Sequence, residues 1–241
     1  MGRLTAREED LVAKFTADVQ AALGGRLVSL VLYGSGAGDE WIDGRSDLNT
    51  VVVVPRADAS ALEALAPVVI RWRPHDFAVP LVLDAEFVER ARDTFPIELD
   101  DIRRQHRLLA GRDVFADVTV DRAALRRECE QEARGKLLRL RALFLDAAAA
   151  PADADGPLLA SLKSFLVLLR HLLALRGKHP GPRYADALRA GEAVVGPLPA
   201  MRRLLAIRDA GGTDGRASRT DFAAYLEEAG RIVAALDRVD A

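Results

Sequence analysis

The sequence is poor in cysteine and lysine, and each shortage excludes something. Cys129 is the only cysteine among 241 residues, so neither an internal disulfide nor a cysteine-built zinc site can form. Cys129 lies in a helical pattern, and we interpret it as a structural thiol. Only four of the 34 basic residues are lysine, and the formal net charge is −2. This balance gives no electrostatic reason to expect binding to nucleic acid or to a membrane surface.

Long hydrophobic runs are also missing. The first residues, MGRLTAREED, are charged and lack the apolar region of a signal peptide. No run approaches the roughly 18 consecutive apolar residues that are typical of a membrane-spanning helix. We therefore expect a cytoplasmic protein that does not associate with membranes. Half of the residues are nevertheless hydrophobic, which is enough for a sizeable core in one or two domains.

The four histidines show no spacing typical of a metal site, neither H-x-x-x-H nor H-E-x-x-H. His171 lies inside the most apolar helical pattern, where a packed core histidine is the simpler interpretation. HEPN ribonucleases place an arginine a helical turn or more before a histidine. Here Arg170 adjoins His171, and Arg176 precedes His179 within a turn rich in glycine and proline, so that spacing is absent.

The first half of the chain alternates helical and strand patterns. Thr5 and Glu8 have the T-x-x-E spacing of a capping box, which predicts a helix ending at Gly24-Gly25. Pro67 indicates a break or a kink in a helix over residues 60–72. Helices that alternate with strands favour a mixed sheet with helices packed on it. The remaining predicted elements are a helix over residues 85–93 and strands over residues 26–34, 47–54, 78–84 and 95–99.

From residue 121 onward the pattern is helical only. One amphipathic segment begins at Asp121 and extends to about residue 150, where the sequence PADADGP interrupts it. The segment 158–176 is apolar on most sides, so we expect it at the centre of a bundle. The chain therefore divides into an α/β domain over residues 1–120 and a C-terminal helical bundle over residues 121–241, an α+β organisation. Further helices are predicted over residues 184–194, 199–210 and 221–239.

One loop between two predicted strands carries the chemistry: LYGSGAGDEWIDGRSDLNTVVVV, residues 32–54. Gly34 and Ser35 end the first strand in a turn whose backbone N–H groups and hydroxyl can cradle phosphate oxygens. Asp47 and Asn49, two residues apart on the second strand, project to the same face. Taken singly these features are common, because Gly-Ser turns are frequent and an aspartate at a strand edge usually faces water.

Other acids could complete such a site. Glu98, in the predicted strand FPIEL, comes from a neighbouring strand, with Asp100 in phase with it. Three carboxylates beside a phosphate cradle would form a two-metal phosphoryl-transfer site. The loop acids Asp39, Glu40 and Asp43 are more simply solvated. Trp41 has two interpretations, stacking on a base or capping the loop against the core.

Together these residues resemble the polymerase β-type nucleotidyltransferase superfamily, which includes the aminoglycoside and minimal nucleotidyltransferases. The shared pattern is G-S, then S-D-x-[D/N] before an apolar strand, and it covers roughly residues 26–110. The resemblance implies a mixed sheet with flanking helices, followed by a helical bundle. It also implies that Gly34, Ser35 and Arg45 hold a nucleoside triphosphate and that Asp47 and Glu98 are catalytic. The implied ligands of Mg²⁺ or Mn²⁺ are Asp47, Asn49 and Glu98.

Asn49 departs from the superfamily pattern, which has a second aspartate at that position. An amide oxygen is a neutral and weaker ligand for a hard cation than a carboxylate, so metal binding and catalysis should suffer. The pattern S-D-L-N with F-P-I-E and a helical C-terminal half resembles a bacterial subgroup that carries the same asparagine.

Two functions follow from this resemblance. The first is nucleotidyl transfer from a Mg²⁺-bound triphosphate to a hydroxyl on a small molecule or a protein, with catalysis weak or absent. The second is a degenerate nucleotidyltransferase that binds a nucleotide or a protein partner without catalysis. The acceptor, the nucleotide preference and the existence of a homodimer stay open at this stage.

Overall fold

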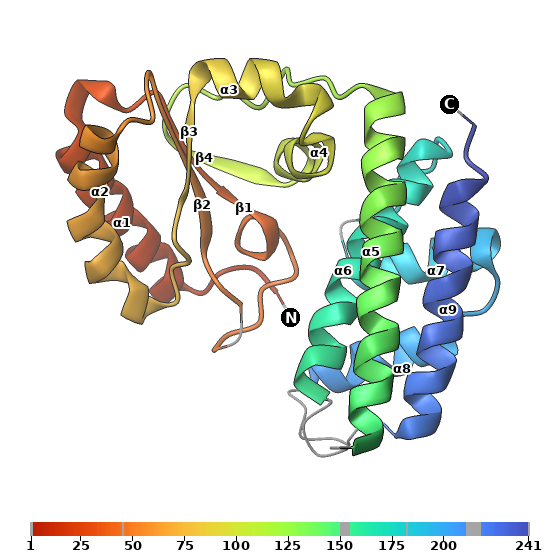
Figure 1. The fold of residues 1–241 in the computed structure, drawn as a ribbon. Helices are drawn as coiled ribbons and strands as arrows, with labels where there is room; N and C mark the ends of the chain where they lie inside the picture. Colours follow the sequence, from red (N-terminus) through yellow and green to blue (C-terminus); the bar gives the residue numbers. More distant parts are fainter. Residues whose placement is uncertain (1, 45, 150–154, 182, 211–217, 241) are drawn as a thin grey trace. The chain divides into compact units, whose positions relative to one another are not determined.

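A computed structural model describes residues 2–44, 46–149, 155–181, 183–210 and 218–240. The chain folds as two compact units, Met1–Asp121 and Arg122–Ala241. The first unit contains a sheet with helices on both faces, and the second is helical wherever the structure describes its regular elements (Figure 1).

The first unit contains one four-stranded mixed sheet in the described residues, in the order β3-β2-β1-β4. Strand β1 pairs antiparallel with both of its neighbours, and β2 pairs parallel with β3. The sequence NTVVVV explains the central position of β2, because β-branched residues suit a strand that is buried on both faces. The strands are β1 (Ser29–Tyr33), β2 (Asn49–Val54), β3 (Leu81–Asp84) and β4 (His106–Gly111).

Two helices pack on each face of this sheet (Figure 1). Helices α1 (Ala6–Leu23) and α2 (Ala59–Trp72) cover one face, and α3 (Ala85–Arg90) and α4 (Pro96–Arg104) lie on the other. Short 3-10 turns connect these elements, among them η2 (Gly34–Ala37) directly after β1. The remaining turns are η1 (Gly24–Arg26), η3 (Arg73–His75) and η4 (Ala91–Asp93).

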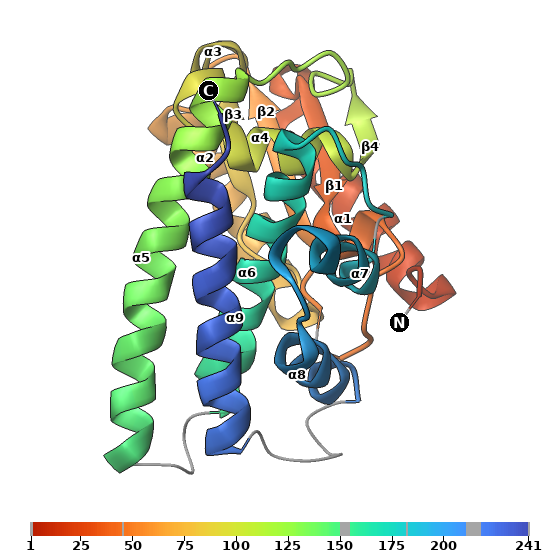
Figure 2. The same cartoon turned by 90° about the vertical axis from the view of Figure 1, so that its right-hand side faces the viewer.

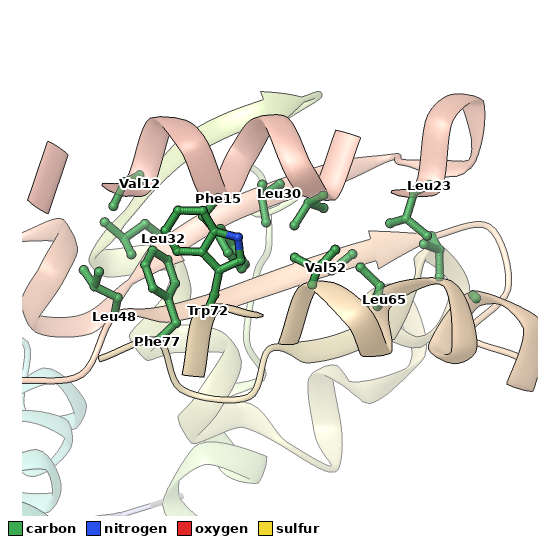
Figure 3. Close-up of a cluster of buried hydrophobic side chains, with 14 of the residues drawn as sticks. Val12, Phe15, Leu23, Leu30, Leu32, Leu48, Val52, Leu65, Trp72 and Phe77 are labelled. Atoms are coloured by element: carbon green, nitrogen blue, oxygen red, sulfur yellow. The ribbon is translucent and has the colours of Figure 1, made fainter. Parts of the chain in front are cut away.

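The face under α1 and α2 carries an aromatic core (Figure 3). The rings of Phe15 and Phe77 stack with centroids 4.4 Å apart, and Trp72 meets both rings edge-on. The indole Nε1 of Trp72 donates a hydrogen bond to Asp18 at 2.7 Å, which satisfies its polar end within the core. Leu48 belongs to the same cluster and fixes which face the start of β2 buries.

The predicted capping box at the start of α1 is confirmed. The backbone N–H of Thr5 donates to Glu8 Oε2 at 2.8 Å, and the Thr5 hydroxyl contacts the same carboxylate oxygen. The helix ends at Leu23, just before the two glycines, as predicted. The hydrogen bond from the Thr5 hydroxyl is the main cause that lowers the pKa of Glu8 below its ordinary value of 4.5.

This capping box leads to a pH-dependent stability effect. A carboxyl group with a lowered pKa in the folded protein stabilises the fold above its unfolded pKa, and this stabilisation is lost as the pH falls through the folded pKa. We expect Glu8→Ala to lower the free energy of unfolding by about 1 kcal/mol at pH 7. The difference should shrink below pH 4.5. Urea denaturation of both proteins at pH 7 and pH 3 measures it, and an equal difference at both pH values would contradict the assignment.

The structure differs from the predicted elements of the first unit at three places. FPIEL is not a strand but opens helix α4, with Pro96 at the first helical turn, where its missing N–H costs nothing. Helix α2 continues through Pro67 to Trp72, so of the break or kink expected there the break does not occur. Strand β4 is present although no strand was predicted over residues 106–111. The predicted strands over residues 26–34, 47–54 and 78–84 are confirmed.

The second unit consists of helices, with α5, α6 and α9 running alongside one another (Figure 2). Cys129 on α5 is fully buried, and His171 on α6 is 1% exposed, as expected for core residues. Glu228 on α9 is buried and accepts hydrogen bonds from the backbone N–H groups of Ala200 and Met201, which caps the start of α8. The helices are α5 (Arg122–Ala149), α6 (Asp155–Leu175), α7 (Tyr184–Val195), α8 (Pro199–Asp209) and α9 (Arg219–Asp237).

Helix α6 is the core helix of this unit. Its stretch Pro157–Leu175 is long and apolar enough to cross a membrane by length and composition alone, a test that core helices of soluble proteins also pass. Of the 18-residue segment of that stretch with the highest hydropathy, 56% is buried inside the structure. The prediction that this helix is buried is confirmed by four leucines that have no exposed surface: Leu162, Leu166, Leu169 and Leu173.

Candidate functional site

The glycine-rich turn η2 follows strand β1 directly. Gly34 has a φ of 70°, a left-handed conformation that glycine adopts without the steric cost of a side chain. Its N–H donates to the carbonyl of Gln105 at 3.1 Å, and the N–H of Gly38 donates to the carbonyl of Ser35 at 3.3 Å. Within the described residues, the Ser35 hydroxyl forms no hydrogen bond. The turn therefore presents a hydroxyl that is available to a ligand.

Asn49 opens β2 on the sheet face opposite to Leu48, and Asp47 lies two residues before it, ahead of the strand. Leu48 packs into the core under α1 and α2, whereas Val51 and Val53 pack on the α3 and α4 face. Because side chains alternate along a strand, Asn49 falls in the row of Val51 and Val53. Asp47 is exposed and Asn49 is partly buried. The core contacts thus place Asn49 on the sheet face of α3 and α4, and the shared face of Asp47 and Asn49 stays a prediction.

The side chain of Asn49 already makes a local contact. Its Nδ2 donates a hydrogen bond to the backbone carbonyl of Asp47 at 3.1 Å. This contact leaves the Asn49 amide oxygen as the atom that a cation could use. Asn49 is also paired with Tyr33 in the β1–β2 register, so the end of β1 and the start of β2 bring both side chains to one place.

Glu98 lies on helix α4, on the same sheet face as Asn49. Burial, then the charge of Glu98 and then that of Asp101 raise the pKa of the Tyr33 hydroxyl above its ordinary value. Both acids therefore lie near Tyr33, which is the strand partner of Asn49. Glu98 is exposed in the first turn of α4. It lies on the sheet face of Asn49, but it is carried there by a helix.

Asp100 does not share the orientation of Glu98. The prediction that they are in phase assumed a strand. The segment is an α-helix, on which residues two positions apart point in nearly opposite directions. Asp100 is 3% exposed, and its carboxylate receives hydrogen bonds from Arg103 at 2.7 Å and from Arg104 at 2.5 Å. Asp100 thus stabilises the end of α4, and its buried pairing keeps it out of the site.

Residues of the loop between the turn and β2 contact other parts of the first unit. Trp41 is 4% exposed and belongs to the core under α1 and α2, so it caps the loop rather than presenting a free face to a base. Asp39 pairs with Arg3 at 3.1 Å on the surface. Arg45, the expected phosphate-binding arginine, lies outside the described residues.

The donor set for a metal ion is small. Among the described residues, no group of three or more histidine, cysteine, aspartate or glutamate side chains could hold a metal ion. The ligands predicted from the sequence contribute two carboxylates, from Asp47 and Glu98, and the amide oxygen of Asn49.

The similarity of this chain to known proteins lies in its fold. No protein-family model matches the chain, and no curated protein matches its sequence. Among solved structures it is similar to spectinomycin adenyltransferase AAD(9) from Enterococcus faecialis, determined with ATP and spectinomycin. The sequence identity is 17% and the TM-score is 0.57, over 97% of this chain and 100% of that chain. The two chains share their fold.

The shared fold confirms the architecture that the sequence resemblance implied, a mixed sheet with flanking helices followed by a helical part. Within this fold two participants at the candidate site, Tyr33 and Gln105, were not predicted. Tyr33 could have been noticed because it adjoins Gly34 at the strand end. Gln105 carried no sequence signal, since its contact with the turn depends on where α4 ends.

Proposed function

We propose that this chain is a nucleotidyltransferase-type protein that binds a Mg²⁺-bound nucleoside triphosphate and transfers its nucleotidyl group weakly or not at all. One observation carries the proposal: within a nucleotidyltransferase fold, the turn with Ser35 lies at the end of β1, and Asn49 opens the adjoining strand β2, two residues after Asp47. In this proposal residues 1–120 form the nucleotidyltransferase-like domain, and residues 121–241 form the accompanying bundle.

Each site residue has a role that its chemistry suits. Gly34 and Ser35 hold phosphate oxygens through the turn's backbone N–H groups and the hydroxyl, and Arg45 pairs with them. Asp47 and Asn49 hold Mg²⁺ or Mn²⁺ together with the phosphates. The bound ion supplies neutralisation of the phosphate charge.

The transfer itself needs a base near the acceptor. The acceptor hydroxyl oxygen bonds to the α-phosphorus, and the bond from that phosphorus to the oxygen of the β-phosphate breaks, which releases pyrophosphate. The proton of the hydroxyl passes to a carboxylate, and we assign this role to Glu98. Its place on α4 puts an exposed carboxylate near Tyr33, the strand partner of Asn49, which supports this role.

The ligand chemistry of Asn49 supports the proposal that transfer is weak. Asn49 contributes a neutral oxygen where the superfamily pattern has a carboxylate, and its Nδ2 is bonded to the Asp47 carbonyl. Mg²⁺ prefers charged oxygen ligands in a strict octahedral arrangement. One charge fewer at the site would therefore weaken the binding of a metal ion by these residues.

A non-catalytic role is the second candidate function. It is favoured by the absence, among the described residues, of a cluster of three metal-binding acids or histidines. In that case the fold binds nucleotide, or a protein partner, without chemistry. The structure of the matched enzyme contains ATP and spectinomycin. A nucleotide and a small-molecule acceptor are therefore the first ligands to test.

The test is calorimetric titration with the four ribonucleoside triphosphates, with Mg²⁺, with Mn²⁺ and with EDTA. We expect the native protein to bind at least one triphosphate and to bind it at least about tenfold more weakly in EDTA, a difference of about 1.4 kcal/mol. Asp47→Asn should weaken binding similarly, whereas Asp43→Asn removes the same charge from an exposed position of the same loop and should change little. Native protein that binds no triphosphate under any of these conditions would refute the proposal.

A further inference from the structure

Gln105 connects the two segments that carry the candidate site. Its backbone N–H donates to the carbonyls of Asp101 and Ile102, at 3.1 and 3.2 Å, and so ends helix α4. Its own carbonyl accepts the N–H of Gly34 at 3.1 Å. One residue therefore joins the helix of Glu98 to the turn of Ser35 through its main chain.

The side chain of Gln105 supports the other end of the same turn. A Cβ atom at Gly38 would lie 1.7 Å from Gln105 Nε2, so the amide occupies the space that any larger residue at position 38 would need. Main chain and side chain of Gln105 thus contact the turn at Gly34 and at Gly38. Together these contacts define the path of the residues between them, including Ser35.

The amide nitrogen of Gln105 has an unused donor capacity. Nε2 is buried and has no hydrogen-bond partner among the described residues. Buried donors are nearly always paired, and a donor left unpaired in a fold calls for a ligand or another explanation. Nε2 lies beside Gly38, which directly follows the turn, so the positive end of the amide dipole adjoins a turn proposed to hold phosphate oxygens.

We propose that Gln105 is the positioning residue of the phosphate-binding turn. It holds Gly34 and Gly38 at a fixed distance from α4, and its amide N–H₂ group makes the potential beneath the turn favourable to an anion. This inference rests on the proposed function for the identity of the anion, a triphosphate. The support of the turn itself does not depend on any ligand.

The ligand-independent part is tested by amide hydrogen exchange of the native protein, Gln105→Ala and Gln105→Met. We expect Gln105→Ala to speed exchange at Gly34 and Gly38 about tenfold, because opening costs less free energy without the side chain. Gln105→Met keeps most of the packing and should exchange like the native protein at Gly38. Exchange at these two glycines that is unchanged in Gln105→Ala would overturn the positioning role.

The electrostatic part is tested by titrating ATP and adenosine into Gln105→Glu and into a matched control. Gln20→Glu adds the same charge at an exposed position of α1. We expect Gln105→Glu to bind Mg²⁺-ATP at least about tenfold more weakly than Gln20→Glu, while adenosine binding is equal. Equal ATP affinity in the two variants would overturn this part. If the native protein binds no ATP, the proposed function fails, and the exchange measurement alone decides whether Gln105 positions the turn.

Discussion

Replacing Asn49 with aspartate should tighten Mg²⁺ binding in the presence of a nucleoside triphosphate by at least about tenfold, or 1.4 kcal/mol. The substitution adds a charged oxygen two residues from Asp47, and charge stabilisation by a catalytic metal is worth several kcal/mol. We also expect slow transfer, visible as release of pyrophosphate or as labelling of the protein itself. Titration of Mn²⁺ and Mg²⁺ into the nucleotide complex measures the first effect.

The same substitution should cost stability when no ligand is present. In the native protein Asn49 Nδ2 donates to the Asp47 carbonyl, whereas a carboxylate at that position would face the carbonyl oxygen without a donor. We expect a loss of about 1 kcal/mol, which metal and nucleotide together should reverse. Asn49→Ala is the control, since it also loses the hydrogen bond but gains no ligand. Efficient transfer by the native protein that disappears in Asp47→Ala would contradict the assignment of Asn49 as the cause of weak catalysis.

Substitution of Leu166 by alanine should strongly destabilise the helical unit. Leu166 lies on α6 with no exposed surface, and its neighbours on the same helix at positions 162, 169 and 173 are equally buried. Removing a buried leucine side chain costs about 2–5 kcal/mol, depending on how far the surrounding residues relax. Thermal and chemical denaturation followed by circular dichroism measure the loss.

The control for this substitution is Leu138→Ala on α5. Leu138 is 63% exposed, so its truncation removes little buried surface and should change the free energy of unfolding by less than about 0.5 kcal/mol. An unchanged melting midpoint for Leu166→Ala, or equal effects of the two substitutions, would show that α6 is not the core helix of the unit.

Much of the first unit could be predicted because its signals are local. The capping box of Thr5 and Glu8, the glycines that end α1 and the run of valines in β2 each determine structure within a few residues. The sheet face of Asn49 follows from strand periodicity alone, once Leu48 is recognised as a core residue. These features are consistent with the structure because no distant contact opposes them.

The predictions of structure failed where local sequence signals conflict with one another or where tertiary contacts determine the structure. FPIEL has a strand-like alternation of apolar residues. However, Pro96 at the start of the segment and Arg103 and Arg104, which follow FPIEL at the end of α4, are typical of a helix. Strand β4 pairs along the whole length of β1, yet its residues are only partly buried, so its sequence lacks clear alternation. The contact of Gln105 with Gly38 depends on both elements and could not be predicted from either.

The central claim, that the turn after β1 holds a triphosphate with Asp47, is tested most directly by locating the bound nucleotide in solution. Amide resonances of isotopically labelled native protein can be followed while Mg²⁺-ATP is added, with adenosine as the uncharged comparison. We expect shifts at Gly34, Ser35 and Asn49 with Mg²⁺-ATP that adenosine does not reproduce. Shifts confined to residues 122–241, or no shifts with any nucleotide, would contradict the claim.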